Sequence, residues 1–80
     1  MSAVEAQEVK SLLLRSNDLY RQLSERHHQL DDRLHQLTGL PYLTVSEQLE
    51  EVTLKKRKLA LKDQMEQMAL DYAKAHIRAS

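Results

Sequence analysis

The chain has 80 residues, enough for one domain at most, and chains of this size bury too little apolar surface to be stable without reinforcement. It contains no cysteine, which excludes a disulfide framework, a thiolate nucleophile and cysteine-based metal sites. The charges of the 12 basic and 12 acidic residues cancel, so no overall electrostatic field attracts nucleic acid or anionic lipid. We expect oligomerisation to provide the additional stability that a chain of this size needs.

The composition is 30% charged and 41% hydrophobic, with a single glycine and a single proline, which is typical of long helices. The longest aliphatic run is Leu12-Leu13-Leu14, far shorter than a membrane span or the apolar segment of a signal peptide. We therefore expect an all-α, soluble, cytoplasmic protein that has no association with membranes.

The residues before Gly39 predict a helix over about 3–38 with one apolar face. The residues of this face recur at alternating spacings of three and four: Val9, Leu13, Ser16, Tyr20, Leu23, His27, Leu30, Leu34 and Leu37. Ser16, Asn17 and Asp18 prefer helix caps to helix interiors. We expect either a kink near 15–18 or a short leading helix with a new start at Asn17.

The segment 39–44 contains the strongest helix-breaking residues, Gly39 and Pro41. We expect Gly39 to adopt the left-handed conformation just past the helix end, and Pro41 prevents the helix from resuming at once. Thr44 and Glu47 have the spacing of a capping box, in which each side chain accepts a hydrogen bond from the other residue's backbone N–H. A second helix is predicted over about 45–78.

The second helix is apolar on two roughly opposite sides, so it needs two neighbours. Pairing the helices about the turn places Leu37 level with Val45 and Leu23 level with Leu59. This register predicts a hairpin core made of Leu23, Leu30, Leu34, Leu37, Leu49, Val52 and Leu59. The other face is predicted to be an oligomer interface made of Leu54, Leu61, Met65, Met68 and Tyr72.

Residues 1–80 are thus expected to form a single domain, an antiparallel and coiled-coil-like hairpin of two helices. A soluble monomer seldom tolerates a continuous exposed apolar strip such as the second face of the later helix. We therefore predict a homodimer in the form of a four-helix bundle, or a larger assembly that uses the same face.

Two strings of residues resemble a known family. They are Tyr20-x-x-Leu23-x-x-x-His27-x-x-Leu30-Asp31-x-x-Leu34 and Leu54-Lys55-Lys56-x-Lys58-Leu59-x-Leu61-Lys62-Asp63. They resemble the YdcH-like family of small bacterial proteins, grouped as domain of unknown function 465. The resemblance implies a helical hairpin that self-associates in a bacterial cytoplasm and has no agreed biochemical activity.

Histidine and carboxylate side chains share one face of the first predicted helix, at His28, Asp31, Asp32 and His35. Such spacing can ligate zinc or nickel, which makes His28, Asp32 and His35 weak candidate ligands. A solvated surface with helix-stabilising pairs explains the same pattern, and we favour it because no fourth ligand is evident. No metal or cofactor is therefore expected. We expect His27, beside Lys55 and Lys56, to be a neutral structural residue.

Catalysis is not expected, because the chain has no glycine-rich phosphate loop and a helical hairpin offers no concave site that excludes water. The basic residues Lys55, Lys56, Arg57, Lys58 and Lys62 suggest contact with nucleic acid, but they encircle the helix and acidic clusters bracket them. We therefore predict a non-catalytic scaffold that binds itself and an unknown protein partner. The alternative is a small nucleic-acid-associated protein that uses segment 55–62.

Overall fold

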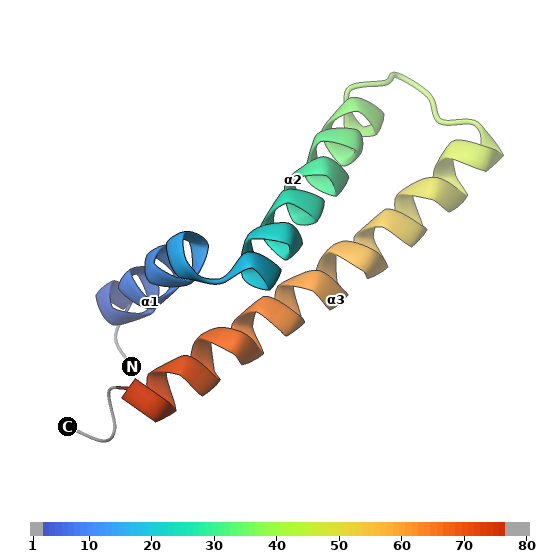
Figure 1. Cartoon of the computed structure of the whole chain (residues 1–80). Helices are drawn as coiled ribbons and strands as arrows, with labels where there is room; N and C mark the ends of the chain where they lie inside the picture. Colours follow the sequence, from blue (N-terminus) through green and yellow to red (C-terminus); the bar gives the residue numbers. More distant parts are fainter. Residues whose placement is uncertain (1–2, 77–80) are drawn as a thin grey trace.

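The structure is a computed structural model that describes residues 3–76. Figure 1 shows three helices, α1 (Ala3–Ser16), α2 (Asp18–Thr38) and α3 (Val45–His76). The all-α class is confirmed, with no strand in the described residues. The first predicted segment has the expected alternative form, a short leading helix followed by a new one, so the described residues form three helices and not two. The predicted helix end at residue 78 lies outside the described residues. None of the three helices is long and apolar enough to cross a membrane.

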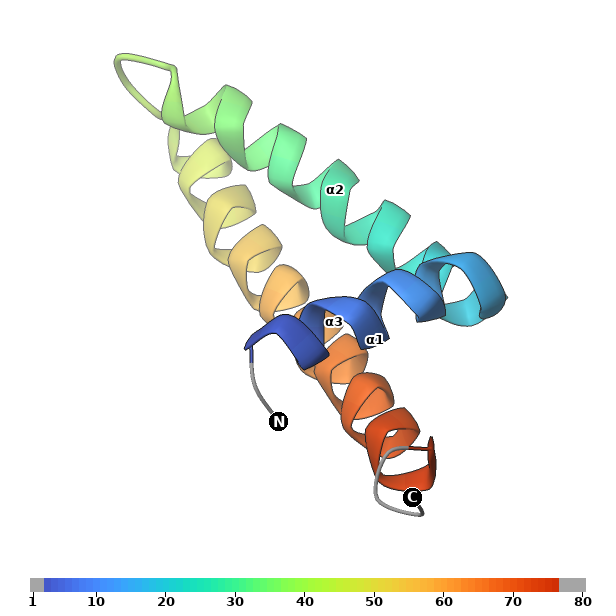
Figure 2. The ribbon, with the colours of Figure 1, turned by 90° about the vertical axis from the view of Figure 1, so that its left-hand side faces the viewer.

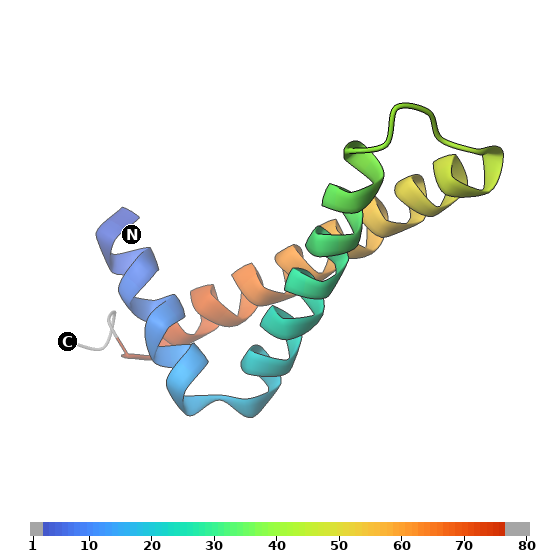
Figure 3. The ribbon, with the colours of Figure 1, turned by 90° about the horizontal axis from the view of Figure 1, so that it is seen from above.

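Asn17 separates α1 from α2. Its backbone is extended, with φ −124° and ψ 113°, and its side-chain oxygen accepts a hydrogen bond of 2.9 Å from the backbone N–H of Tyr20. The break falls within the predicted interval 15–18, and it has the form of a new helix start. Because the chain changes direction here, α1 does not extend α2 but lies against the C-terminal half of α3 (Figures 2 and 3).

The connection between α2 and α3 begins at Gly39, which has a right-handed backbone conformation with φ −77° and ψ −9°. The predicted left-handed conformation is wrong, and none of the described residues has a positive φ. The helix end is instead closed by hydrogen bonds from the N–H of Gly39 to the carbonyl of His35 (3.1 Å) and from the N–H of Leu40 to the carbonyl of Leu37 (3.2 Å).

The start of α3 has the predicted capping box. The backbone N–H of Thr44 donates to Glu47 Oε1 at 2.9 Å, and the N–H of Glu47 donates to Thr44 Oγ1 at 3.1 Å. These bonds satisfy two donors that would otherwise have no partner at the helix end. The first turn of α3 is therefore fixed by local chemistry alone.

Two small apolar clusters hold the helices together. The turn cluster lies between α2 and α3 and contains Leu30, Leu34, Leu37, Leu43 and Leu54. The junction cluster joins all three helices and contains Val9, Leu13, Tyr20, Met65, Met68, Ala69, Tyr72 and Ala73. The molecule is elongated, with a radius of gyration of 15.8 Å, compared with about 12 Å for a compact domain of this length.

The face of α3 that packs against α2 is not the predicted one. Leu49, Val52 and Leu59 are 66%, 51% and 59% exposed, so their assignment to the hairpin core is wrong. Leu54, assigned to the oligomer interface, is only 8% exposed. The α2 part of the predicted core is correct, since Leu23, Leu34 and Leu37 are buried and Leu30 is partly buried.

The rotation of α3 about its own axis differs from the prediction. Arg33 on α2 forms two hydrogen bonds with the carboxylate of Glu50 on α3, at 2.8 and 2.9 Å. The rotation follows from α1. Val9 and Leu13 cover the α3 face that carries Met65, so this face becomes the interior.

We predict that Gly39→Ala leaves the free energy of unfolding unchanged or raises it by up to about 1 kcal/mol, because alanine restricts the unfolded chain. A Cβ atom at Gly39 would lie 3.6 Å from the carbonyl oxygens of His35 and Gln36, which is ordinary contact. Urea unfolding measures the change. Thr44→Ala, which breaks the capping box, should lower stability by about 1 kcal/mol. A clear loss in Gly39→Ala would contradict the right-handed turn.

Candidate interaction surface

Apolar side chains remain open to solvent along one side of α3. Val45, Leu49, Val52, Leu59 and Leu70 are all exposed. When Lys56 and Asp63 are included, successive residues from Val45 to Asp63 are alternately four and three positions apart. Side chains at this spacing form one continuous stripe on a helix. We call it the α3 seam: Val45, Leu49, Val52, Lys56, Leu59, Asp63 and Leu70.

Two charged residues interrupt the α3 seam. Lys56 and Asp63 are both exposed, and neither forms an ion pair with another described residue. They lie seven residues apart, about 10 Å along the helix, which is too far for them to pair with each other. The seam thus carries one positive and one negative charge at fixed positions, flanked by leucine and valine.

The residues predicted to form the oligomer interface do not make a free face. Leu54 belongs to the turn cluster, and Met65, Met68 and Tyr72 pack on the junction cluster. Leu61 is partly buried and lines a cavity between α2 and α3. Most residues of the predicted interface therefore hold the three helices of one chain together.

Ion pairs also link the helices to one another. Lys10 on α1 reaches Glu66 on α3 at 2.8 Å, Arg33 reaches Glu50 at 2.8 Å, and Lys58 pairs with Asp31. The hydrogen bond from Lys10 lowers the pKa of Glu66 from its usual value, and that from Arg33 lowers the pKa of Glu50.

These pairs are partly exposed, so they orient the helices more than they stabilise them. Sequence reasoning missed them. The sequence contains these opposite charges, but it does not show which of them become neighbours, because that depends on the packing of α1 and the rotation of α3.

The five basic residues of segment 55–62 do not form one patch. Lys55 pairs with Glu51 at 3.3 Å, and Lys58 pairs with Asp31. Lys56, Arg57 and Lys62 take part in no ion pair among the described residues, but they point in three different directions around α3. No surface suited to following a phosphate backbone results from this arrangement.

The weak candidate metal ligands His28, Asp32 and His35 are exposed on α2. His35 Nδ1 lies 2.9 Å from the carbonyl oxygen of Asp31 and 3.8 Å from its carboxylate. Residues 3–76 contain no group of three or more histidine, cysteine or acidic side chains that could hold a metal ion.

His27 lies at a cavity where all three helices meet, a cavity that is also lined by Lys58 and Lys62. Desolvation by partial burial lowers the pKa of His27 below 6.5, and the positive charge of Lys58 lowers this pKa further. Asp31 raises the pKa of His27 by a smaller amount, and His28 and Lys62 lower it slightly. The expectation of a neutral His27 agrees with this direction.

These features define a small all-helical protein in which α3 exposes an apolar face that also carries two charged residues, Lys56 and Asp63. The chain belongs to the family described as Protein of unknown function (DUF465), which matches residues 21–69. This is the YdcH-like family, so the resemblance found in the sequence is confirmed. Comparisons with curated proteins and with solved structures found no match.

We predict that His27 titrates below pH 6.5 in the folded protein, with the midpoint measured by NMR of its ring protons. Because the unfolded chain then binds the proton more readily, His27 lowers the free energy of unfolding as pH falls from about 6.5 through the folded pKa. It has no such effect above that window. Lys58→Met should raise the midpoint, whereas a midpoint above 6.5 in the wild type would contradict the prediction.

Proposed function

We propose that this protein is a non-catalytic interaction protein of the cytoplasm that self-associates through the α3 seam. The observation that supports the proposal most is the exposure of Leu49, Val52 and Leu59 on one helix face. Several large apolar side chains gathered on one exposed helix face are typical of interaction sites. The two small clusters within the chain add a second reason, since a chain of this size gains stability from association.

Burial of the seam would supply the driving force. Fully burying a leucine or valine that was in water contributes about 1.5–3 kcal/mol, and the four residues Val45, Leu49, Val52 and Leu59 are each at least half exposed. Two copies therefore offer eight such side chains to one interface. This gain must exceed the entropy lost on association, so the seam must be covered along most of its length.

The charges of the seam favour a second copy in antiparallel orientation. A two-fold axis beside Leu59 sets Lys56 of each copy level with Asp63 of the other copy, and Leu49 level with Leu70. A parallel pair would instead place Lys56 against Lys56 and Asp63 against Asp63. Exposed ion pairs contribute little affinity, but like charges in contact exclude the wrong orientation.

The seam lies on the side of α3 opposite Leu54, which packs against α2. An antiparallel dimer would therefore place its helices in the order α2, α3, α3 and α2, as a flat layer. This differs from a square four-helix bundle. The outer, polar side of each α2 stays free for another protein, as a scaffold requires.

Combining Leu49→Asp with Leu59→Asp should convert a dimer of about twice 9.3 kDa into a folded monomer. Both residues are exposed in one chain, so the helix content by circular dichroism should be unchanged. Light scattering during gel filtration measures the mass. The matched control is Gln22→Asp with Gln29→Asp, which adds the same charge to exposed positions of α2 and should stay dimeric. A wild type that is monomeric at tens of micromolar would refute the proposal.

The orientation is tested by exchanging the seam charges. Lys56→Asp and Asp63→Lys should each weaken the dimer by about tenfold or more, since each places like charges opposite one another. The double variant should recover wild-type affinity. An equimolar mixture of the two single variants should form a heterodimer, as measured by sedimentation. Failure of both the double variant and the mixture to recover affinity would exclude antiparallel pairing about Leu59.

A further inference from the structure

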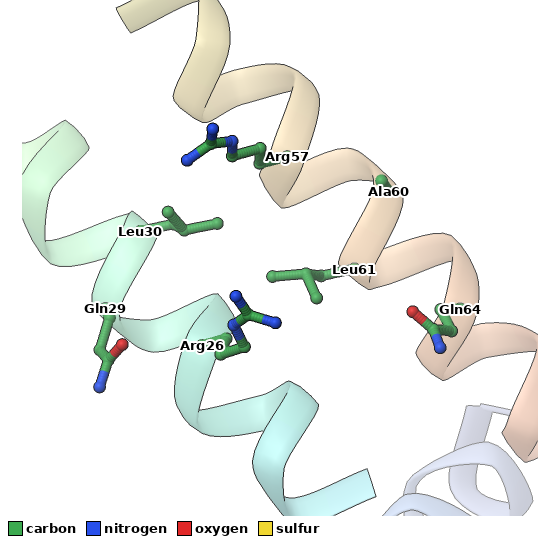
Figure 4. Close-up of a pocket in the computed structure, with 7 residues that line it drawn as sticks. All are labelled: Arg26, Gln29, Leu30, Arg57, Ala60, Leu61 and Gln64. Atoms are coloured by element: carbon green, nitrogen blue, oxygen red, sulfur yellow. The ribbon is translucent and has the colours of Figure 1, made fainter. Parts of the chain in front are cut away.

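An open cavity of about 420 Å³ lies between α2 and α3. In Figure 4, Leu30 from α2 and Leu61 from α3 point toward one another across this space, and Arg26 and Arg57 extend into it from the two helices. Gln29, Ala60 and Gln64 complete its lining. The cavity lies between the turn cluster and the junction cluster, where the two helices lack a continuous apolar contact.

The two guanidinium groups are not neutralised. Arg26 and Arg57 form no ion pair with any described residue, and no carboxylate lines the cavity. Elsewhere on this hairpin the arginine between the helices is paired, as Arg33 is with Glu50. The cavity therefore has two unpaired positive charges in its lining, which an anion would balance.

The chemistry of the lining matches an oxyanion that carries a small apolar group. A guanidinium presents a planar set of donors that fits carboxylate or phosphate oxygens, often through two parallel hydrogen bonds. Gln29 and Gln64 are further polar residues of the lining. Leu30 and Leu61 offer an apolar surface between the two charges. Binding sites for small molecules commonly combine an apolar lining with a few convergent polar groups.

We propose that this cavity binds a small organic oxyanion, a carboxylate or a phosphate ester, through Arg26 and Arg57, with its apolar part on Leu30 and Leu61. The site is independent of self-association. Arg57 and Leu61 each lie about 160° around α3 from Leu59, so the seam and the cavity face different directions. A failed dimer test would therefore leave this proposal standing, and the reverse also holds.

The test is a titration of the full-length protein with hexanoate, acetate, butyl phosphate and inorganic phosphate at constant ionic strength. Two-dimensional NMR follows the Arg26 and Arg57 Nε–H signals and the methyl signals of Leu30 and Leu61. We expect chemical-shift changes that saturate. Hexanoate should bind at least about fivefold more tightly than acetate, or butyl phosphate at least about fivefold more tightly than inorganic phosphate, since roughly 0.8 kcal/mol accompanies each buried methylene. The carboxylate and phosphate arms identify which oxyanion the site prefers.

Arg26→Gln and Arg57→Gln should each weaken the tighter ligand by at least about tenfold, because each removes one charged hydrogen-bonding partner. Both residues are exposed, so the variants should keep the wild-type circular dichroism spectrum. Arg15→Gln, on the exposed surface of α1, is the control for loss of charge and should bind as the wild type does. Shifts that do not saturate, or an affinity that is the same in all three variants, would overturn the proposal.

Discussion

The structure depends on one constraint: α3 is apolar on two opposite sides, and the helices of the described residues 3–76 cover only one of them. The buried side carries Leu54, Met65 and Ala69, which contact α2 and α1. The other side carries Leu49, Val52 and Leu59, which contact water. This is why a protein with well-formed helices still presents an apolar surface.

Local chemistry could be predicted from the sequence. The capping box of Thr44 and Glu47 and the new helix start at Asn17 depend on residues three positions apart, so no tertiary information was needed. The apolar residues of α2 were also assigned correctly, since α2 has only one apolar face. Gly39 was the local exception, because glycine permits a left-handed turn without requiring one.

The rotation of α3 could not be predicted, because both of its faces offered leucines at suitable levels for pairing with α2. The choice between them is made by α1, whose residues Val9 and Leu13 pack beside Met65. The sequence shows that a break exists at Asn17 but not where the preceding helix goes. The candidate sites could not be predicted for the same reason, since the exposed seam and the cavity between Arg26 and Arg57 both depend on the rotation of α3.

The most direct test of which α3 face lies outward is cross-linking with a short thiol-reactive reagent, since the chain has no cysteine of its own. Two single variants, Leu59→Cys and Leu61→Cys, place one thiol on each face of α3. An outward seam with its two-fold axis beside Leu59 predicts rapid formation of covalent dimer in Leu59→Cys and little in Leu61→Cys. Cross-linking of Leu61→Cys but not of Leu59→Cys would contradict the account.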